Sequence, residues 1–237
     1  MAQRPQDSRR SDWNDYNNRC NPRDSRLSRL WVQDLRAWLL SSRSVGAGLV
    51  VLDYGCGSFD LGFELAEQVS RVDGYDINPQ AIRLARGRAA RRSGVFGLYA
   101  DADQIPDRTY DVIVANSVIQ YLASLEAVAE FLHSAKVKLK PVRGAMIVLC
   151  DLIPCRYPAA LDALESAVYA LRKAAIGPMF LHLWRTATRP SRFELLHIDR
   201  TTIQDAARDA GCECELLDEN LTPSKRRYSC VLRPRSS

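Results

Sequence analysis

Residues 49–57, Leu-Val-Val-Leu-Asp-Tyr-Gly-Cys-Gly, decide the fold of this chain. The segment opens with an uninterrupted apolar run, which is typical of a parallel strand buried on both faces. It closes with an acid and two glycines, and glycines at 55 and 57 let the backbone turn sharply and approach a ligand closely. We therefore predict a buried strand that ends at a ligand-binding turn.

Strands and helices alternate along the chain on the C-terminal side of this segment. Asn78 and Pro79 form a strong helix start, because asparagine caps free N–H groups and proline at the first helical position loses no hydrogen bond. Apolar periodicity predicts strands near 72–76, 95–99, 110–115 and 144–151, and helices over 25–40, 61–69, 78–92 and 124–138. This alternation favours a mostly parallel sheet with helices on both faces.

The alternation breaks after the fifth predicted strand. Residues 152–196 form one long connection with a helix predicted over 158–175, and an insertion of this length is usually a lid or a binding element. It mixes aromatic residues with Arg185, Arg189 and Arg192, a combination that suits an acidic or polar organic acceptor. The alternative is a helical cap whose aromatic residues face the sheet and whose arginines face water.

Regular structure is predicted again after residue 196. Thr201 and Gln204 make a capping box for a helix that ends at Gly211. Two strands follow near 212–217 and 227–232, and basic residues beside the second indicate a sheet edge. Residues 25–237 are thus predicted as one domain, preceded by a mobile basic arm over 1–24 whose Trp13 and Tyr16 can cover a pocket.

Charge is distributed unevenly along the 237 residues, whose formal net charge is +5. Residues 1–43 hold nine Arg and five Asp, residues 222–237 hold five basic residues and no acid, and the middle has a net charge of −4. Because only the ends are basic, the whole-chain charge gives little support to nucleic-acid binding.

Composition also bears on compartment and on metals. No segment approaches the roughly 18 apolar residues of a membrane span, and the N-terminus is polar and arginine-rich rather than a signal peptide. The seven cysteines include no CxxC pair, so the sequence indicates no metal site. Reduced thiols in a cytoplasmic protein are the expectation.

Two acids follow the first two predicted strands, at the sheet edge where open α/β folds bind ligands. Asp53 suits a ligand with a positive group, and Asp76 can accept hydrogen bonds from both hydroxyls of a ribose. A dinucleotide fold is the nearest rival, but its third glycine would fall at Asp60, where a negative side chain would repel a pyrophosphate.

The third predicted strand is followed by Tyr99-Ala100-Asp101-Ala102-Asp103-Gln104-Ile105-Pro106, and Tyr110-Asp111-Val112-Ile113 opens the fourth. Together with the first two motifs, these segments resemble the class I S-adenosylmethionine-dependent methyltransferases, strongly over residues 45–151. The resemblance implies a Rossmann-like α/β fold: a seven-stranded, mostly parallel sheet with the last strand antiparallel, an N-terminal helical extension and an insertion after strand five. One departure is Phe59, where many members have a third glycine, and it makes the turn less permissive.

The resemblance implies S-adenosylmethionine as cofactor and a role for each matching residue. Gly55 and Gly57 would pass beneath the methionine part and the ribose, and Asp53 would lie near the amino group. Asp76 would hold the ribose hydroxyls. On the adenine side, Ile77 would lie against the base, Asp101 would bind the adenine amino group and the Ala102 N–H a ring nitrogen. Asn116 would border the methionine moiety and the substrate mouth.

Methyl transfer needs little acid–base machinery, because positioning of nucleophile, methyl carbon and sulfur in line can supply roughly 7–11 kcal/mol. An oxygen or nitrogen nucleophile can still require a base, and the candidates are Tyr121, His182, His197 and Asp151.

The favoured function is methylation of an O or N nucleophile on a small organic acceptor, such as a secondary metabolite or a sugar-like compound. One alternative is an RNA methyltransferase that uses the basic termini, although Asn116-Ser117-Val118-Ile119 departs from the Asn-Pro-Pro-Tyr type of motif of base N-methylating relatives. The other is a non-catalytic module that binds S-adenosylmethionine, against which the acids at 53, 76 and 101 argue.

Overall fold

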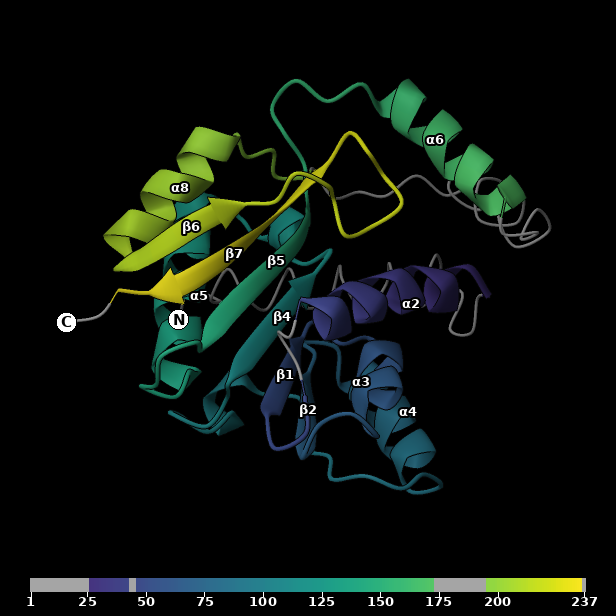
Figure 1. The fold of residues 1–237 in the computed structure, drawn as a ribbon, viewed down its shortest axis with the longest axis vertical. Coiled ribbons are helices and arrows are strands. Elements are labelled where there is room, and N and C mark those ends of the chain that lie inside the picture. Colours follow the sequence, from purple (N-terminus) through teal and green to yellow (C-terminus); the bar gives the residue numbers. More distant parts are fainter. Residues whose placement is uncertain (1–25, 43–45, 173–194, 236–237) are drawn as a thin grey trace, which may run out of the picture.

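The computed structural model describes residues 26–42, 46–172 and 195–235. Within these ranges the chain folds as a twisted sheet flanked by helices (Figure 1). The predictions for the arm over 1–24, and for His182 with the arginines and aromatic residues of the insertion, lie outside the described residues.

Seven strands form one sheet in the described part of the chain, in the order β3-β2-β1-β4-β5-β7-β6. Strands β1 to β5 pair in parallel, whereas β7 is antiparallel to both β5 and β6. The strands are β1 (Val50–Tyr54), β2 (Arg71–Tyr75), β3 (Leu98–Tyr99), β4 (Val112–Asn116), β5 (Met146–Leu152), β6 (Cys212–Leu216) and β7 (Tyr228–Pro234). The predicted mostly parallel, seven-stranded sheet is confirmed.

Helices connect most of the strands, as the alternation predicts. Helix α4 begins at the expected cap, because the side chain of Asn78 accepts a hydrogen bond from Gln80 N at 2.9 Å. Helix α5 is capped by Ser124, whose side chain accepts a hydrogen bond from Ala127 N at 3.4 Å. The helices are α2 (Arg26–Ser41), α3 (Asp60–Leu65), α4 (Pro79–Ala89), α5 (Leu125–Lys138), α6 (Ala159–Arg172) and α8 (Arg200–Asp209), with short 3-10 helices η1 (Ala102–Gln104) and η2 (Ile119–Tyr121).

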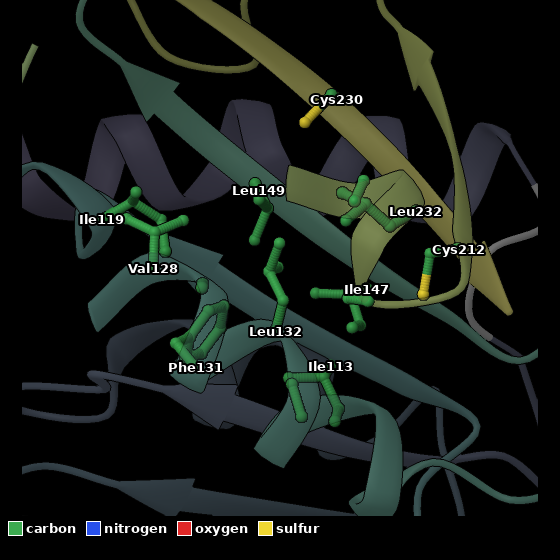
Figure 2. Close-up of a cluster of buried hydrophobic side chains, with 14 of the residues drawn as sticks. Ile113, Ile119, Val128, Phe131, Leu132, Ile147, Leu149, Cys212, Cys230 and Leu232 are labelled. Carbon is green, nitrogen blue, oxygen red and sulfur yellow. The ribbon is translucent and has the colours of Figure 1, made fainter. Parts of the chain in front are cut away.

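Each face of the sheet packs against its own group of helices. Successive strand residues alternate between the two faces, so that Ile113 packs with α5 and α8 and its neighbour Val114 with α2, α3 and α4. Figure 2 shows the first of these cores, in which Val128, Phe131 and Leu132 of α5 meet side chains of β4, β5 and β7. Burial on both faces explains why these strands read as continuous apolar runs.

Two predicted elements are shorter in the structure. The strand expected near 95–99 is reduced to Leu98–Tyr99, because Gly97 N donates to the Asp73 carboxylate at 2.6 Å instead of extending the ladder. The helix expected over 61–69 ends at Leu65, where the chain closes a tight turn with a hydrogen bond from Gln68 N to Leu65 O.

The capping box predicted at Thr201 is wrong. Helix α8 begins at Arg200, and its cap residue is Asp199, whose side chain makes no hydrogen bond to the helix. That carboxylate instead accepts a hydrogen bond from Cys155 N at 3.0 Å. The preceding Ile198 donates its backbone N–H to Ile153 O at 2.7 Å, and Asp199 is still extended, so the helix starts only after this pairing ends.

The strand after Lys225–Arg227 lies next to the edge of the sheet, as predicted, but does not form the edge itself. Strand β7 is an interior strand between β5 and β6, and β6 forms the edge. The basic residues serve ion pairs instead: Arg226 lies 2.9 Å from Glu165 and Arg227 lies 2.7 Å from Asp151. Among the described residues, no helix is long and apolar enough to cross a membrane.

Candidate active site

The turn after β1 adopts the conformation that its glycines permit. Gly55 and Gly57 have φ angles of +77° and +52°, in the left-handed region that favours glycine. A Cβ atom on Gly55 would lie 2.3 Å from Cγ2 of Val118, so this glycine also allows the chain after β4 to pack against the turn. A Cβ atom on Gly57 would meet nothing within 4 Å, so the open side of the turn is at Gly57.

Phe59 adopts a glycine-like conformation, although it is a large aromatic residue. Its φ and ψ angles are 64° and 34°, and its ring is completely buried. The ring packs edge-on against Phe63 and Phe96. The turn therefore keeps the left-handed geometry at position 59, and burial of the ring offsets the backbone strain of a residue other than glycine.

Asp76 connects the ends of β1 and β2. One carboxylate oxygen accepts a hydrogen bond from Gly57 N and the other from Asn78 N, both at 2.8 Å. Burial raises the pKa of Asp76, and these two bonds to its carboxylate act in the opposite direction. Each oxygen retains a second lone pair, so the carboxylate can still accept hydrogen bonds from two ligand hydroxyls.

Asp53 lies in the same buried region. Burial, together with the negative charges of Asp76 and Asp60, raises the pKa of Asp53 from 3.8 to about 8. Near neutral pH the free protein therefore keeps a proton on this carboxyl group. A cationic ligand group would reverse the effect, because a nearby positive charge favours the ionised form.

Asp60 occupies the N-terminal end of α3. Its carboxylate accepts hydrogen bonds from Ser58 Oγ and Arg88 Nη2, both at 2.7 Å. In a dinucleotide-binding fold the N-terminus of this helix would bind a pyrophosphate. Here that position is occupied by Asp60, an acid in an ion pair with Arg88.

The predicted adenine side lies beyond the neighbouring strand end. Asp76 N donates to Tyr99 O at 3.2 Å, which places Asp101 two residues past this contact. Asp101 is exposed and its side chain accepts a hydrogen bond from Asp103 N at 3.1 Å, so that it caps η1. Ile77 and Ala102 are half-buried and pack against the core.

On the other side of β1, Asn116 ends β4 and Ser117 turns the chain with a φ angle of +56°. Asn116 Oδ1 is buried and has no hydrogen-bond partner among the described residues. The same holds for Oε1 of Gln120, a buried residue of η2. Tyr121, a predicted catalytic residue, is half-buried in η2 beside them.

A polar cluster centred on Asp151 lies at the carboxyl end of β5. Asp151 is buried, has a φ angle of +69°, and accepts hydrogen bonds at 2.7 Å from Ser117 Oγ, Thr222 Oγ1 and Arg227 Nη1. Arg227 also donates to the Tyr157 hydroxyl at 3.0 and 3.2 Å. Asp151 is one of the bases that the sequence suggests, whereas no local sequence signal points to Arg227, because only the pairing of β5 with β7 brings it beside Asp151.

The other candidate base, His197, lies at the border of this cluster. It is exposed, and its ring packs edge-on against Tyr157 at 6.0 Å between centroids. The structure thus brings Asp53, Gly57 and Asp76 together on one side of the edge, and Asn116, Tyr121 and Asp151 on the other. No cluster of three or more potential metal-binding His, Cys, Asp or Glu residues occurs among the described residues.

The residues at this edge fit S-adenosylmethionine. Asp76 offers acceptor oxygens for a ribose, the buried acid Asp53 suits an ammonium group, and the open side of Gly57 leaves room for a ligand. The side chains at this edge offer mainly hydrogen-bond acceptors, as expected for a site that binds a ligand with hydroxyl groups and a positive charge.

Comparison with known proteins agrees with this geometry. The methyltransferase domain family matches residues 46–187, more than half of the chain. Ribosomal protein L11 methyltransferase of Dechloromonas aromatica is 45% identical over 80 residues, 33% of this chain and 26% of that protein. The chain thus spans about a quarter of this relative.

Solved structures share the fold over a greater length. Magnesium protoporphyrin IX methyltransferase from Synechocystis, crystallised with S-adenosylmethionine, superposes with a TM-score of 0.61 and 18% identity over 94% of this chain and 95% of that one. Phosphoethanolamine N-methyltransferase 1 of Haemonchus contortus gives a TM-score of 0.65 and 19% identity over 96% of this chain and 48% of that one. The chain therefore belongs to the class I methyltransferases, enzymes that depend on S-adenosylmethionine.

Proposed function

We propose that this enzyme methylates an oxygen or nitrogen nucleophile of a small organic acceptor. The observation that carries the proposal is the buried polar cluster of Ser117, Gln120, Asp151 and Arg227 at the ends of β4 and β5, beside the cofactor edge. A buried cluster joined by hydrogen bonds suits the binding of a small polar molecule, whereas binding of a macromolecule needs exposed side chains.

We assign the cofactor contacts to the residues that the family pattern indicates. Asp76 would accept the ribose hydroxyls, Asp53 would face the ammonium group, and Gly55 and Gly57 would let the backbone pass close to the ligand. On the adenine side, Asp101 and the Ala102 N–H would bind the base edge, and Ile77 would pack on its face. Asn116 would separate the cofactor from the acceptor.

When bound, S-adenosylmethionine supplies a methyl group on a sulfonium leaving group. The chain's own task is to hold the nucleophile in line and to exclude water, an effect worth roughly 7–11 kcal/mol. Asp151 is a poor general base, because its carboxylate is ion-paired with Arg227 and accepts two hydroxyl hydrogen bonds. Tyr121 and His197 remain the candidates for removing a proton, together with His182.

A protein acceptor is the second candidate, favoured by the partial match to L11 methyltransferases. The basic chain ends are the argument for an RNA acceptor. The remaining alternative is a non-catalytic module that binds S-adenosylmethionine. We propose a cytoplasmic location, where the six described cysteines, all free, would stay reduced.

Two measurements test the proposal. Calorimetric titration should give micromolar binding of S-adenosylmethionine and S-adenosylhomocysteine and no binding of NAD. Transfer of a labelled methyl group should then be compared for small amines and hydroxyl compounds, purified ribosomal protein L11 and bulk RNA. Labelling of L11 alone, or RNA binding that weakens steeply with salt, would replace the small-acceptor proposal.

A further inference from the structure

Gln120 is almost completely buried, with 2% of its surface exposed, yet only one end of its amide group has a partner among the described residues. Its Nε2 lies 3.5 Å from Asp151 Oδ2, whereas its Oε1 has no hydrogen-bond partner among the described residues. Buried polar atoms in native proteins are nearly always paired, so an unpaired carbonyl oxygen beside an active site indicates a hydrogen-bond donor that arrives with a ligand.

The surrounding contacts fix which way this amide faces. Asp151 carries a negative charge held by Arg227, and a flipped amide would place the carbonyl oxygen against that carboxylate. The backbone is fixed as well, because Gln120 O accepts a hydrogen bond from Leu196 N at 2.8 Å. The Asp151 cluster therefore holds the side chain with its N–H toward Asp151 and its oxygen away from it.

A second unpaired oxygen lies on the same short segment. It is Oδ1 of Asn116, the last residue of β4. Ser117, which follows Asn116, turns the chain in a left-handed conformation that is costly for a residue other than glycine. Ser117 and Asp151 both adopt this conformation, and a 2.7 Å hydrogen bond joins their side chains. Backbone strain at two adjacent strand ends is typical of positions that hold a functional group in place.

We infer that Gln120 Oε1 and Asn116 Oδ1 form a subsite that accepts hydrogen bonds from an N–H or O–H group at the nucleophilic atom of the methyl acceptor. This inference rests on the proposed function and adds a specificity-determining residue to it: Gln120 selects an amine or a hydroxyl compound as the acceptor. A carbon nucleophile has no such donor and leaves both oxygens unpaired.

Sinefungin tests this subsite without knowledge of the acceptor. In this cofactor analogue a carbon that bears an amino group replaces the methylated sulfonium, so its N–H groups project to the point of methyl transfer. S-adenosylhomocysteine has no group there. The ratio of their dissociation constants, measured by calorimetry, therefore reports hydrogen-bond acceptors at that point. We expect the wild-type protein to bind sinefungin about tenfold more tightly, the effect of one or two hydrogen bonds.

Gln120→Met should reduce this preference to about threefold or less and leave S-adenosylhomocysteine affinity unchanged. Gln120→Asn, which withdraws the amide by one methylene, should act in the same direction and serves if the methionine variant does not fold. The matched control is Gln33→Met on exposed Gln33 of α2, which should retain the wild-type ratio.

The outcomes separate two failures. An unchanged ratio in both Gln120 variants, or a wild-type protein without preference for sinefungin, overturns the subsite alone. A wild-type protein that binds neither analogue overturns the proposed function, and the subsite with it.

Discussion

The ring of Phe59 fills the space into which a Cβ atom on Gly62 would project, with ring carbons 2.1 Å from that position. The same ring lies 2.7 Å from the Cβ position of Gly74 on β2. A phenylalanine with a left-handed backbone conformation in the turn after β1 is thus accommodated by Gly62 of α3 and Gly74 of β2. The three positions form one packing unit.

Substitution within this unit should be strongly non-additive. Gly62→Ala should destabilise the protein by about 1–3 kcal/mol through overpacking, and Phe59→Ala by about 3–5 kcal/mol through loss of a buried ring. The double variant should lose less than the sum, because the alanine methyl at 62 no longer meets a ring. Denaturant unfolding of the four proteins gives the coupling energy, and strict additivity would show that the clash is relieved in another way.

Loss of the Asp76 carboxylate should weaken cofactor binding. Asp76→Ala should raise the dissociation constant of S-adenosylhomocysteine tenfold or more, since charge-assisted hydrogen bonds to a ribose are each worth about 1.5–3 kcal/mol. It also leaves Gly57 N and Asn78 N without their acceptor, so stability must be measured alongside. Asp209→Ala, at an exposed position of α8, is the control and should bind normally.

Binding of the cofactor product should release protons near neutral pH. The pKa of Asp53 is about 8 in the free protein, so the group is mostly protonated at pH 7, and a facing ammonium group would lower this pKa. Calorimetry of S-adenosylhomocysteine binding in buffers of different ionisation enthalpy should report a release approaching one proton. Asp53→Asn should abolish it, and equal release by the variant would exclude Asp53 as the source.

The same group should make the free protein less stable as pH rises from about 4 to 8. In this window Asp53 holds a proton in the folded state but not in the unfolded state, so unfolding releases it and higher pH favours unfolding. The contribution has a slope of at most ~1.4 kcal/mol per pH unit and levels off above pH 8. Asp53→Asn should flatten the pH dependence in denaturant unfolding, and identical profiles would contradict the raised pKa.

Removal of one partner of the Asp151–Arg227 pair should cost more than removal of both. Asp151→Asn leaves a partly buried guanidinium without its anion, and a loss of about 1–3 kcal/mol is expected. The double variant with Arg227→Met should recover part of it. If Asp151 were the general base, Asp151→Asn would instead abolish the acidic limb of the pH–rate profile while stability stayed unchanged.

Much of the structure around the ends of β1 and β2 could be predicted from local sequence. The apolar run before Asp53, the glycines and the Asn78 cap act through neighbouring residues, because strand burial, left-handed turns and helix capping are properties of short segments. The matching order of acids and strands then indicated the family. The strand order itself follows the usual behaviour of alternating strands and helices.

The contacts of Asp151 at the ends of β4 and β5 depend on long-range pairing. Arg227 lies 76 positions from Asp151 along the chain, and only the insertion of β7 between β5 and β6 brings the two together. Likewise Asp199 is the cap of α8 because its side chain accepts a hydrogen bond from Cys155 N and the preceding Ile198 donates one to Ile153 O. No local pattern contains such contacts.

The sequence by itself determined the fold class and the cofactor, since both depend on short motifs with their own conformational preferences. Tertiary structure alone decided that Phe59 could take the place of a glycine and that Asp151 is paired with Arg227. It also decided that the side-chain oxygens of Asn116 and Gln120 have no hydrogen-bond partner among the described residues. Each of these depends on which distant side chains share a buried volume, and burial, charge pairing and hydrogen-bond satisfaction are settled only when the strands meet.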